Sequence, residues 1–97
     1  MNAHKINAVS GAIMSTLVDK MSKKVSADEV RNLYSSLEFM IENERTQEAF
    51  SLLHTIIKTS GVRLPEEYRC IVDSEKLRAD FVEEAVADLE DILYDLA

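Results

Sequence analysis

The stretch that decides the fold is residues 75–96, EKLRADFVEEAVADLEDILYDL. Its apolar residues recur at steps of three and four, which is the period of an α-helix. They form one stripe made of Leu77, Phe81, Ala85, Leu89, Ile92 and Leu96, and a neighbouring stripe made of Val82, Val86 and Leu93. Because the combined apolar face is wide enough to touch two other helices, this segment predicts a long helix packed inside a helical domain.

The rest of the chain has the same period. Apolar residues at helical spacing predict helices over 5–22, 27–42 and 47–60, and Pro65 followed by Glu66 and Glu67 predicts a short helix near 65–72. The expected caps are, in chain order, Ser26 with Glu29 (a capping box flanked by Val25 and Val30), Thr46, Gly61, and Asp73 or Ser74. Short connections between these segments favour antiparallel neighbours.

Composition supports this fold class. The 97 residues include two glycines and one proline, too few for a protein built from turns. The sequence therefore predicts a single all-α domain over 1–97, a small antiparallel bundle of four main helices plus one short helix near 65–72. Gly11 lies inside the first helix with Ala8, Ala12 and Ser15, and these small residues predict a close contact with another helix.

Negative charge is concentrated at the end of the chain. The formal net charge is −7, and residues 80–97 hold seven acidic residues and no basic one. Five of the acidic residues follow steps of three and four beside the main apolar stripe: Asp80, Glu84, Asp88, Asp91 and Asp95, with Glu83 and Glu90 extending the set. Like charges at this spacing repel each other, so the arrangement lowers the stability of the helix.

Two interpretations of this acidic stripe are open. In the first it is a solvated face, partly neutralised because an up-and-down bundle would bring Lys20, Lys23 and Lys24 close to Asp80, Glu83 and Glu84. In the second it docks on a basic surface of another protein, where charge complementarity gives specificity and a fast association rate. The predicted partner-binding residues are Glu84, Asp88, Glu90, Asp91, Tyr94 and Asp95.

Signals for catalysis are weak. His4 and His54 have no Cys, His or carboxylate at the helical spacing of metal ligands, and His54 is expected at the boundary of the core. Cys70 lies in an apolar context, so we expect it to act as a small buried hydrophobe rather than as a nucleophile. With two glycines in all, no glycine-rich phosphate loop is present. The sequence predicts a protein that is not an enzyme and needs no metal or cofactor.

Charge and cysteine content also limit the setting. An acidic chain is repelled by phosphate backbones, so direct nucleic-acid binding is disfavoured. A single cysteine cannot form an internal disulfide, which favours a reducing, cytoplasmic location, and no apolar run is long enough for a membrane span.

These observations favour a small acidic regulator or inhibitor that binds a protein with a basic surface, such as a nucleic-acid-binding protein, through its C-terminal helix. The alternative is a self-associating structural or assembly protein, a homodimer paired through the apolar face of residues 81–96.

Overall fold

The computed structural model describes residues 3–24 and 27–96. In this part the chain forms five α-helices and no strand: α1 Ala3–Lys24, α2 Ala27–Glu42, α3 Thr46–Ser60, α4 Glu67–Asp73 and α5 Glu75–Leu96. The predicted all-α fold of four main helices and one short helix is confirmed. Helices α2 and α5 have the predicted bounds, because their periodic apolar residues continue without interruption to the ends.

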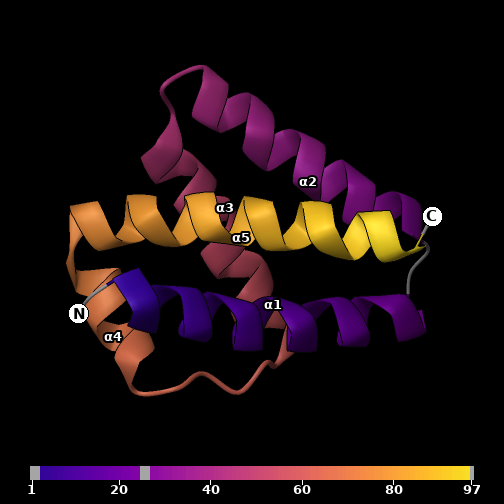
Figure 1. Ribbon diagram of the computed structural model, residues 1–97, viewed down its shortest axis with the longest axis horizontal. Coiled ribbons are helices and arrows are strands. Elements are labelled where there is room, and N and C mark those ends of the chain that lie inside the picture. Colours follow the sequence, from indigo (N-terminus) through magenta and orange to yellow (C-terminus); the bar gives the residue numbers. More distant parts are fainter. Residues whose placement is uncertain (1–2, 25–26, 97) are drawn as a thin grey trace.

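Helix α5 is the central element. It packs against each of the other four helices, lying between α1 and α2 while α3 crosses behind it (Figure 1). Its fully buried side chains are Phe81, Val82, Ala85 and Leu89. They belong to one continuous core to which every helix contributes, including Leu17 of α1, Leu37 of α2, Leu53 of α3 and Ile71 of α4. The width of the apolar face on α5 explains why it reaches more than the two expected helices.

Helices α1 and α5 run parallel, with both amino-terminal ends on the same side of the molecule (Figure 1). Ile6 lies beside Asp80 and Glu84, and one turn further along both helices Ser10 contacts Asp88. The expected proximity of Lys20 to Asp80, Glu83 and Glu84 is therefore wrong, because an up-and-down order would need these two helices to run in opposite directions. The side chains of Lys23 and Lys24 lie outside the described part of the chain.

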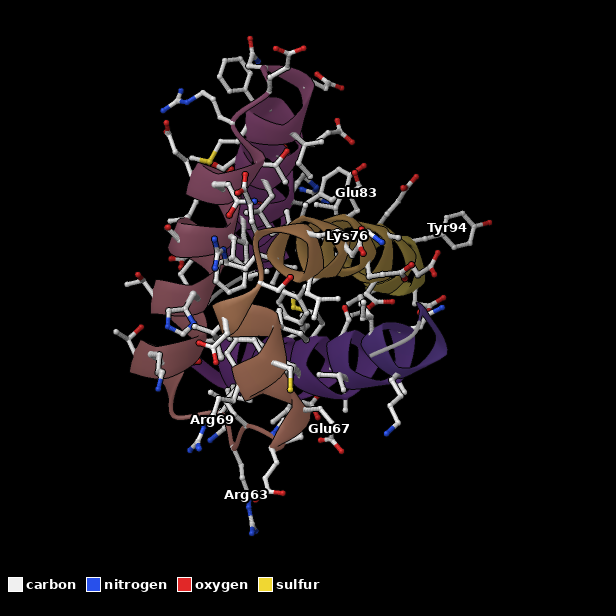
Figure 2. The ribbon with its side chains drawn as sticks, turned by 90° about the vertical axis from the view of Figure 1, so that its left-hand side faces the viewer. Arg63, Glu67, Arg69, Lys76, Glu83 and Tyr94 are labelled. Atoms are coloured by element: carbon white, nitrogen blue, oxygen red, sulfur yellow. The ribbon has the colours of Figure 1, made fainter. Side chains whose placement is uncertain are left out.

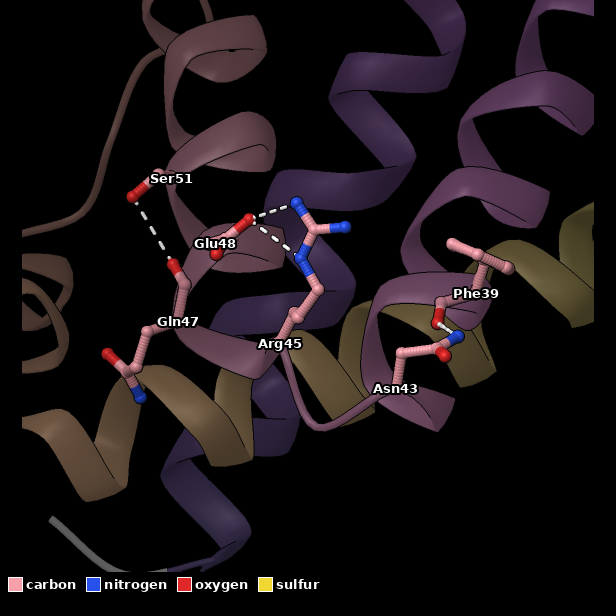
Figure 3. Close-up of polar contacts among 6 residues, drawn as sticks. All are labelled: Phe39, Asn43, Arg45, Gln47, Glu48 and Ser51. Atoms are coloured by element: carbon pink, nitrogen blue, oxygen red, sulfur yellow. Dashed lines mark hydrogen bonds and ion pairs between the residues drawn. The ribbon is translucent and has the colours of Figure 1, made fainter.

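The connection between α2 and α3 is a tight turn (Figure 3). Asn43 donates its side-chain amide to the carbonyl of Phe39 at 2.7 Å, and Glu44 adopts a left-handed backbone with φ of 60°. Arg45 precedes α3 and its guanidinium binds the carboxylate of Glu48. Arg45 rather than Thr46 thus occupies the cap position, and its side chain makes no capping hydrogen bond to the backbone of α3.

A polar junction fixes the start of α5. The Ser74 hydroxyl accepts a hydrogen bond from the amide of Leu77 at 3.3 Å, so Ser74 is the cap of α5 as predicted. The Arg78 guanidinium donates to the carbonyl of Val72 at 2.5 Å and to the side chain of Gln47 at 2.8 Å. Arg78 therefore joins α5 to the end of α4 and to the start of α3.

The apolar side chains of α3 differ in burial. Phe50 is buried together with Ala49, Leu53 and Ile57. Leu52 and Ile56 are half-buried beside Leu33 of α2, because α3 contacts α2 on one side and α1 and α5 on the other. The capping-box residue Ser26 and its neighbour Val25 lie outside the described residues.

Substitution by alanine is expected to have opposite effects at the two glycines. Gly61 ends α3 with φ of 75°, as expected for a helix-terminating glycine, whereas Gly11 lies within α1 with no atom within 4 Å of an added Cβ. The predicted close packing at Gly11 is thus wrong: Gly11 is half-buried, and Ala8, Ala12 and Ser15 are exposed. We expect Gly61→Ala to destabilise the protein by about 1–2 kcal/mol and Gly11→Ala to stabilise it by about 0.5–1 kcal/mol. Urea unfolding of the two variants checks this, and two shifts of the same sign would contradict it.

Candidate functional site

The predicted partner-binding residues all lie on α5, but they do not share one face. Asp88 faces α1, where it accepts a hydrogen bond of 2.8 Å from the hydroxyl of Ser10, a side chain with 0% exposure. Glu90, two residues later, lies about 200° away round the helix, since an α-helix has 3.6 residues per turn. Asp88 is therefore a contact between helices, while Glu90 belongs to the opposite flank of α5.

Glu84 is also on the α1 flank. It is half-buried and lines a hollow of about 190 Å³ together with Ile6, Asp80 and Glu83. The amino-terminal half of the acidic stripe thus lies along the first turns of α1. This half of the acidic stripe therefore exposes less carboxylate surface to solvent than it would on an isolated helix.

Glu90 lies on the side of α5 that packs against α2. Its charge acts on Tyr34 of α2, whose hydroxyl donates a hydrogen bond of 2.6 Å to Glu38. This hydrogen bond raises the pKa of Tyr34 to about 12, with smaller contributions from burial and from the charges of Glu38 and Glu90. Tyr34 therefore stays protonated and serves as a donor near neutral pH.

The carboxyl-terminal turns of α5 carry the most exposed group. Tyr94 is exposed by 83% and projects outward from α5 (Figure 2), and Glu90, Asp91 and Asp95 beside it are exposed too. We call these four residues the Tyr94 patch. Glu90 and Asp91 precede Tyr94 by four and three residues, so they lie on the neighbouring turn of the same face. None of the three carboxylates forms a salt bridge with a described side chain.

A second polar cluster lies between α3 and α4. The ring nitrogen Nδ1 of His54 and the hydroxyl of Tyr68 are 2.7 Å apart, and the rings of Phe50, His54 and Tyr68 stack at centroid distances of 5.5–6.3 Å. His54 is half-buried, as expected for a residue at the core boundary. The sequence did not predict its pairing with Tyr68, because the two residues lie on different helices fourteen positions apart.

The environment of His54 predicts a pH-dependent stability. Burial lowers the pKa of His54, and the charge of Lys58 lowers it further. The folded pKa is thus below the ordinary value of about 6.5, so the unfolded chain binds the proton more tightly. The contribution of His54 to the free energy of unfolding is fully present above the ordinary pKa. It is lost as the pH falls through the folded pKa, with a slope of at most about 1.4 kcal/mol per pH unit.

We therefore expect His54→Gln to remove one component of the loss of stability between about pH 7 and pH 5. The measurement is the free energy of unfolding of both proteins across that range. Lys58→Gln is the matched control: it should reduce this component without abolishing it, because burial remains. If the difference in the free energy of unfolding between wild type and His54→Gln is constant over this range, His54 is not the source of the pH dependence.

Cys70 is exposed and forms no disulfide, so the expectation that it is buried is wrong. Helix α4 buries Tyr68 and Ile71, which lie three residues apart on one face. Cys70 precedes Ile71 by one position and so faces away from that side.

Among the described residues, no three or more His, Cys, Asp or Glu side chains are placed to hold a metal ion, and the expectations of no metal and no cofactor stay predictions. Across residues 3–24 and 27–96, none of the helices combines the length and the apolar character needed to cross a bilayer. Comparison with models of protein families, with curated proteins and with solved structures found no match to this chain.

Proposed function

We propose that the chain is a non-enzymatic protein-binding regulator that docks through the Tyr94 patch on a basic surface of its partner. The observation that carries this proposal is the 83% exposure of Tyr94 on a regular helix, with exposed carboxylates on both sides of it. Large aromatic side chains are commonly anchors in protein interfaces, and tyrosine loses little conformational entropy when it is fixed there.

The charges of the Tyr94 patch favour a basic partner. Asp91 and Asp95 are four residues apart and lie at the negative end of the α5 dipole, an arrangement that disfavours each by about 0.3–1 kcal/mol before screening by salt. A cationic surface would offset this repulsion and would steer the two proteins together. A nucleic-acid-binding protein is one class of partner with such a surface, whereas direct binding of nucleic acid by a chain of net charge −7 is disfavoured.

Side-chain exposure supports four of the six predicted contact residues in this proposal. Glu90, Asp91, Tyr94 and Asp95 remain candidates for direct contact, while Asp88 is engaged by Ser10 and Glu84 lies in the hollow beside α1. A reducing compartment such as the cytoplasm suits the proposal, because the exposed thiol of Cys70 would be open to oxidation elsewhere.

Self-association remains the alternative, but not through the apolar face on which it was predicted. Phe81, Val82, Ala85 and Leu89 of that face are buried within the monomer. A homodimer would instead need another surface, and sedimentation at high micromolar concentration tests for one.

The direct test is quantitative capture from cell extract on immobilised wild-type protein and on two variants, Tyr94→Ala and Phe39→Ala. Phe39 is the matched control, since it is a large aromatic residue with 59% exposure on α2. Proteins retained by wild type and by Phe39→Ala but lost with Tyr94→Ala, and eluted by raised salt, would support the proposal. Equal retention of every captured protein by all three forms would contradict it.

A further inference from the structure

We propose that the hollow between the end of α3 and α4 binds a small organic anion with a planar apolar body, such as an aromatic carboxylate. The hollow has a volume of about 400 Å³. That is near the lower end of the range of about 300–1,000 Å³ found for small-molecule sites, so it suits a molecule of one or two rings. Its walls include His54, Lys58, Leu64, Pro65, Tyr68 and Arg69.

The hollow follows from the way the chain leaves α3. Gly61 ends the helix in a left-handed conformation, and the segment 62–66 then loops outward before α4 begins at Glu67 (Figure 1). Val62 is buried and anchors the start of this loop in the core. The space between the loop, α4 and the outer face of α3 is left open. His54 and Lys58 reach it together because they are four residues apart on that face.

The charged side chains that line the hollow favour an anionic ligand. Lys58 and Arg69 are cationic, and among the described residues that line the hollow Glu66 is the only acidic one. Neither cation forms a hydrogen bond or an ion pair with any residue of the described chain, so both are available to a ligand. Figure 2 shows Arg69 near Arg63 on the side of α4, away from Tyr94, so this site is separate from the Tyr94 patch. In a chain of net charge −7, this local excess of positive charge is an exception.

The apolar and aromatic side chains that line the hollow favour a ligand with a planar ring. Leu64, Pro65 and Val72 supply aliphatic surface. The rings of His54 and Tyr68 lie within 15° of parallel, and the contact between Nδ1 of His54 and the Tyr68 hydroxyl holds the pair in place. Tyr68 has 3% exposure and Phe50 stacks on both rings, so the half-buried ring of His54, held in a fixed orientation, is the surface on which a flat ligand ring can stack at little entropic cost. A carboxylate on that ring would then reach Lys58 or Arg69 through a charge-assisted hydrogen bond.

The probe for the test is 2-naphthoate, with 2-naphthamide as its neutral counterpart. The readout is the NMR signals of the His54 and Tyr68 rings during a titration of the full chain. We expect saturable shifts with 2-naphthoate, and binding weaker by at least about tenfold for 2-naphthamide. The double variant Lys58→Gln/Arg69→Gln should weaken binding of 2-naphthoate by a similar factor.

Arg63→Gln is the matched control, because Arg63 is an exposed cation of the same loop that does not line the hollow. It should leave the affinity unchanged. The proposal is overturned by the absence of saturable shifts at millimolar 2-naphthoate, by equal affinity for the acid and the amide, or by equal losses in the double variant and in Arg63→Gln. The amide spectra of the variants establish that each one is folded.

Discussion

Phe81→Ala is expected to lower the free energy of unfolding by about 3–5 kcal/mol. Phe81 has 0% exposure and meets the ring of Phe50 on α3 at 6.1 Å and the ring of Tyr68 on α4 at 5.5 Å, both in edge-to-face geometry. Truncation would leave a cavity where three helices meet. A domain of this size has a total stability of about 5–15 kcal/mol, so the loss is a large share of it.

Urea unfolding followed by circular dichroism measures this effect. Tyr94→Ala is the matched control on the same helix, and we expect it to change the free energy of unfolding by no more than about 0.5 kcal/mol, because its side chain is exposed. A loss below about 1 kcal/mol for Phe81→Ala would show that α5 is not the centre of the core.

Asp88→Ala is expected to cost about 1–3 kcal/mol. The substitution removes the acceptor of the Ser10 hydroxyl, which is fully buried between α1 and α5. A buried polar group without a partner loses its hydration and gains nothing in return. Asp88→Asn keeps an acceptor oxygen at the same position and should recover part of the loss.

The control for this prediction is Asp95→Ala, which removes an exposed carboxylate from the same helix and should be neutral or slightly stabilising. A double-mutant cycle that combines Asp88→Ala with Ser10→Ala isolates the contact. A coupling energy of zero would argue against the hydrogen bond between Ser10 and Asp88.

The helices could be predicted from the sequence because their signals are local. The apolar period gave both ends of α2 and α5, and Gly61 and Ser74 marked the boundaries where a left-handed residue and a hydroxyl cap are needed. The relative directions of the helices could not be predicted in this way. The apolar stripes of α1 and α5 show which faces are buried, but they contain no local signal for the relative direction of the two helices.

The same limit applies to the sites. Tyr94 was predicted as an anchor, and its exposure agrees with that role without testing it. The grouping of Asp88 with Glu90 was wrong, because a spacing of two residues separates the flanks of a helix. The burial of Phe50 and the pairing of His54 with Tyr68 depend on contacts between residues far apart in the chain, on α3, α4 and α5, for which the sequence contains no local signal.

The central claim is that the Tyr94 patch is a docking surface for a basic partner. The most direct measurement is the affinity of a captured partner for wild type, for Tyr94→Ala and for Glu90→Gln/Asp91→Asn/Asp95→Asn, at low and at high salt. We predict a loss of at least about tenfold with Tyr94→Ala at both salt concentrations. The charge variant should bind weakly and lose the salt dependence seen with wild type. Affinities that are equal for all three proteins at both salt concentrations would contradict the claim.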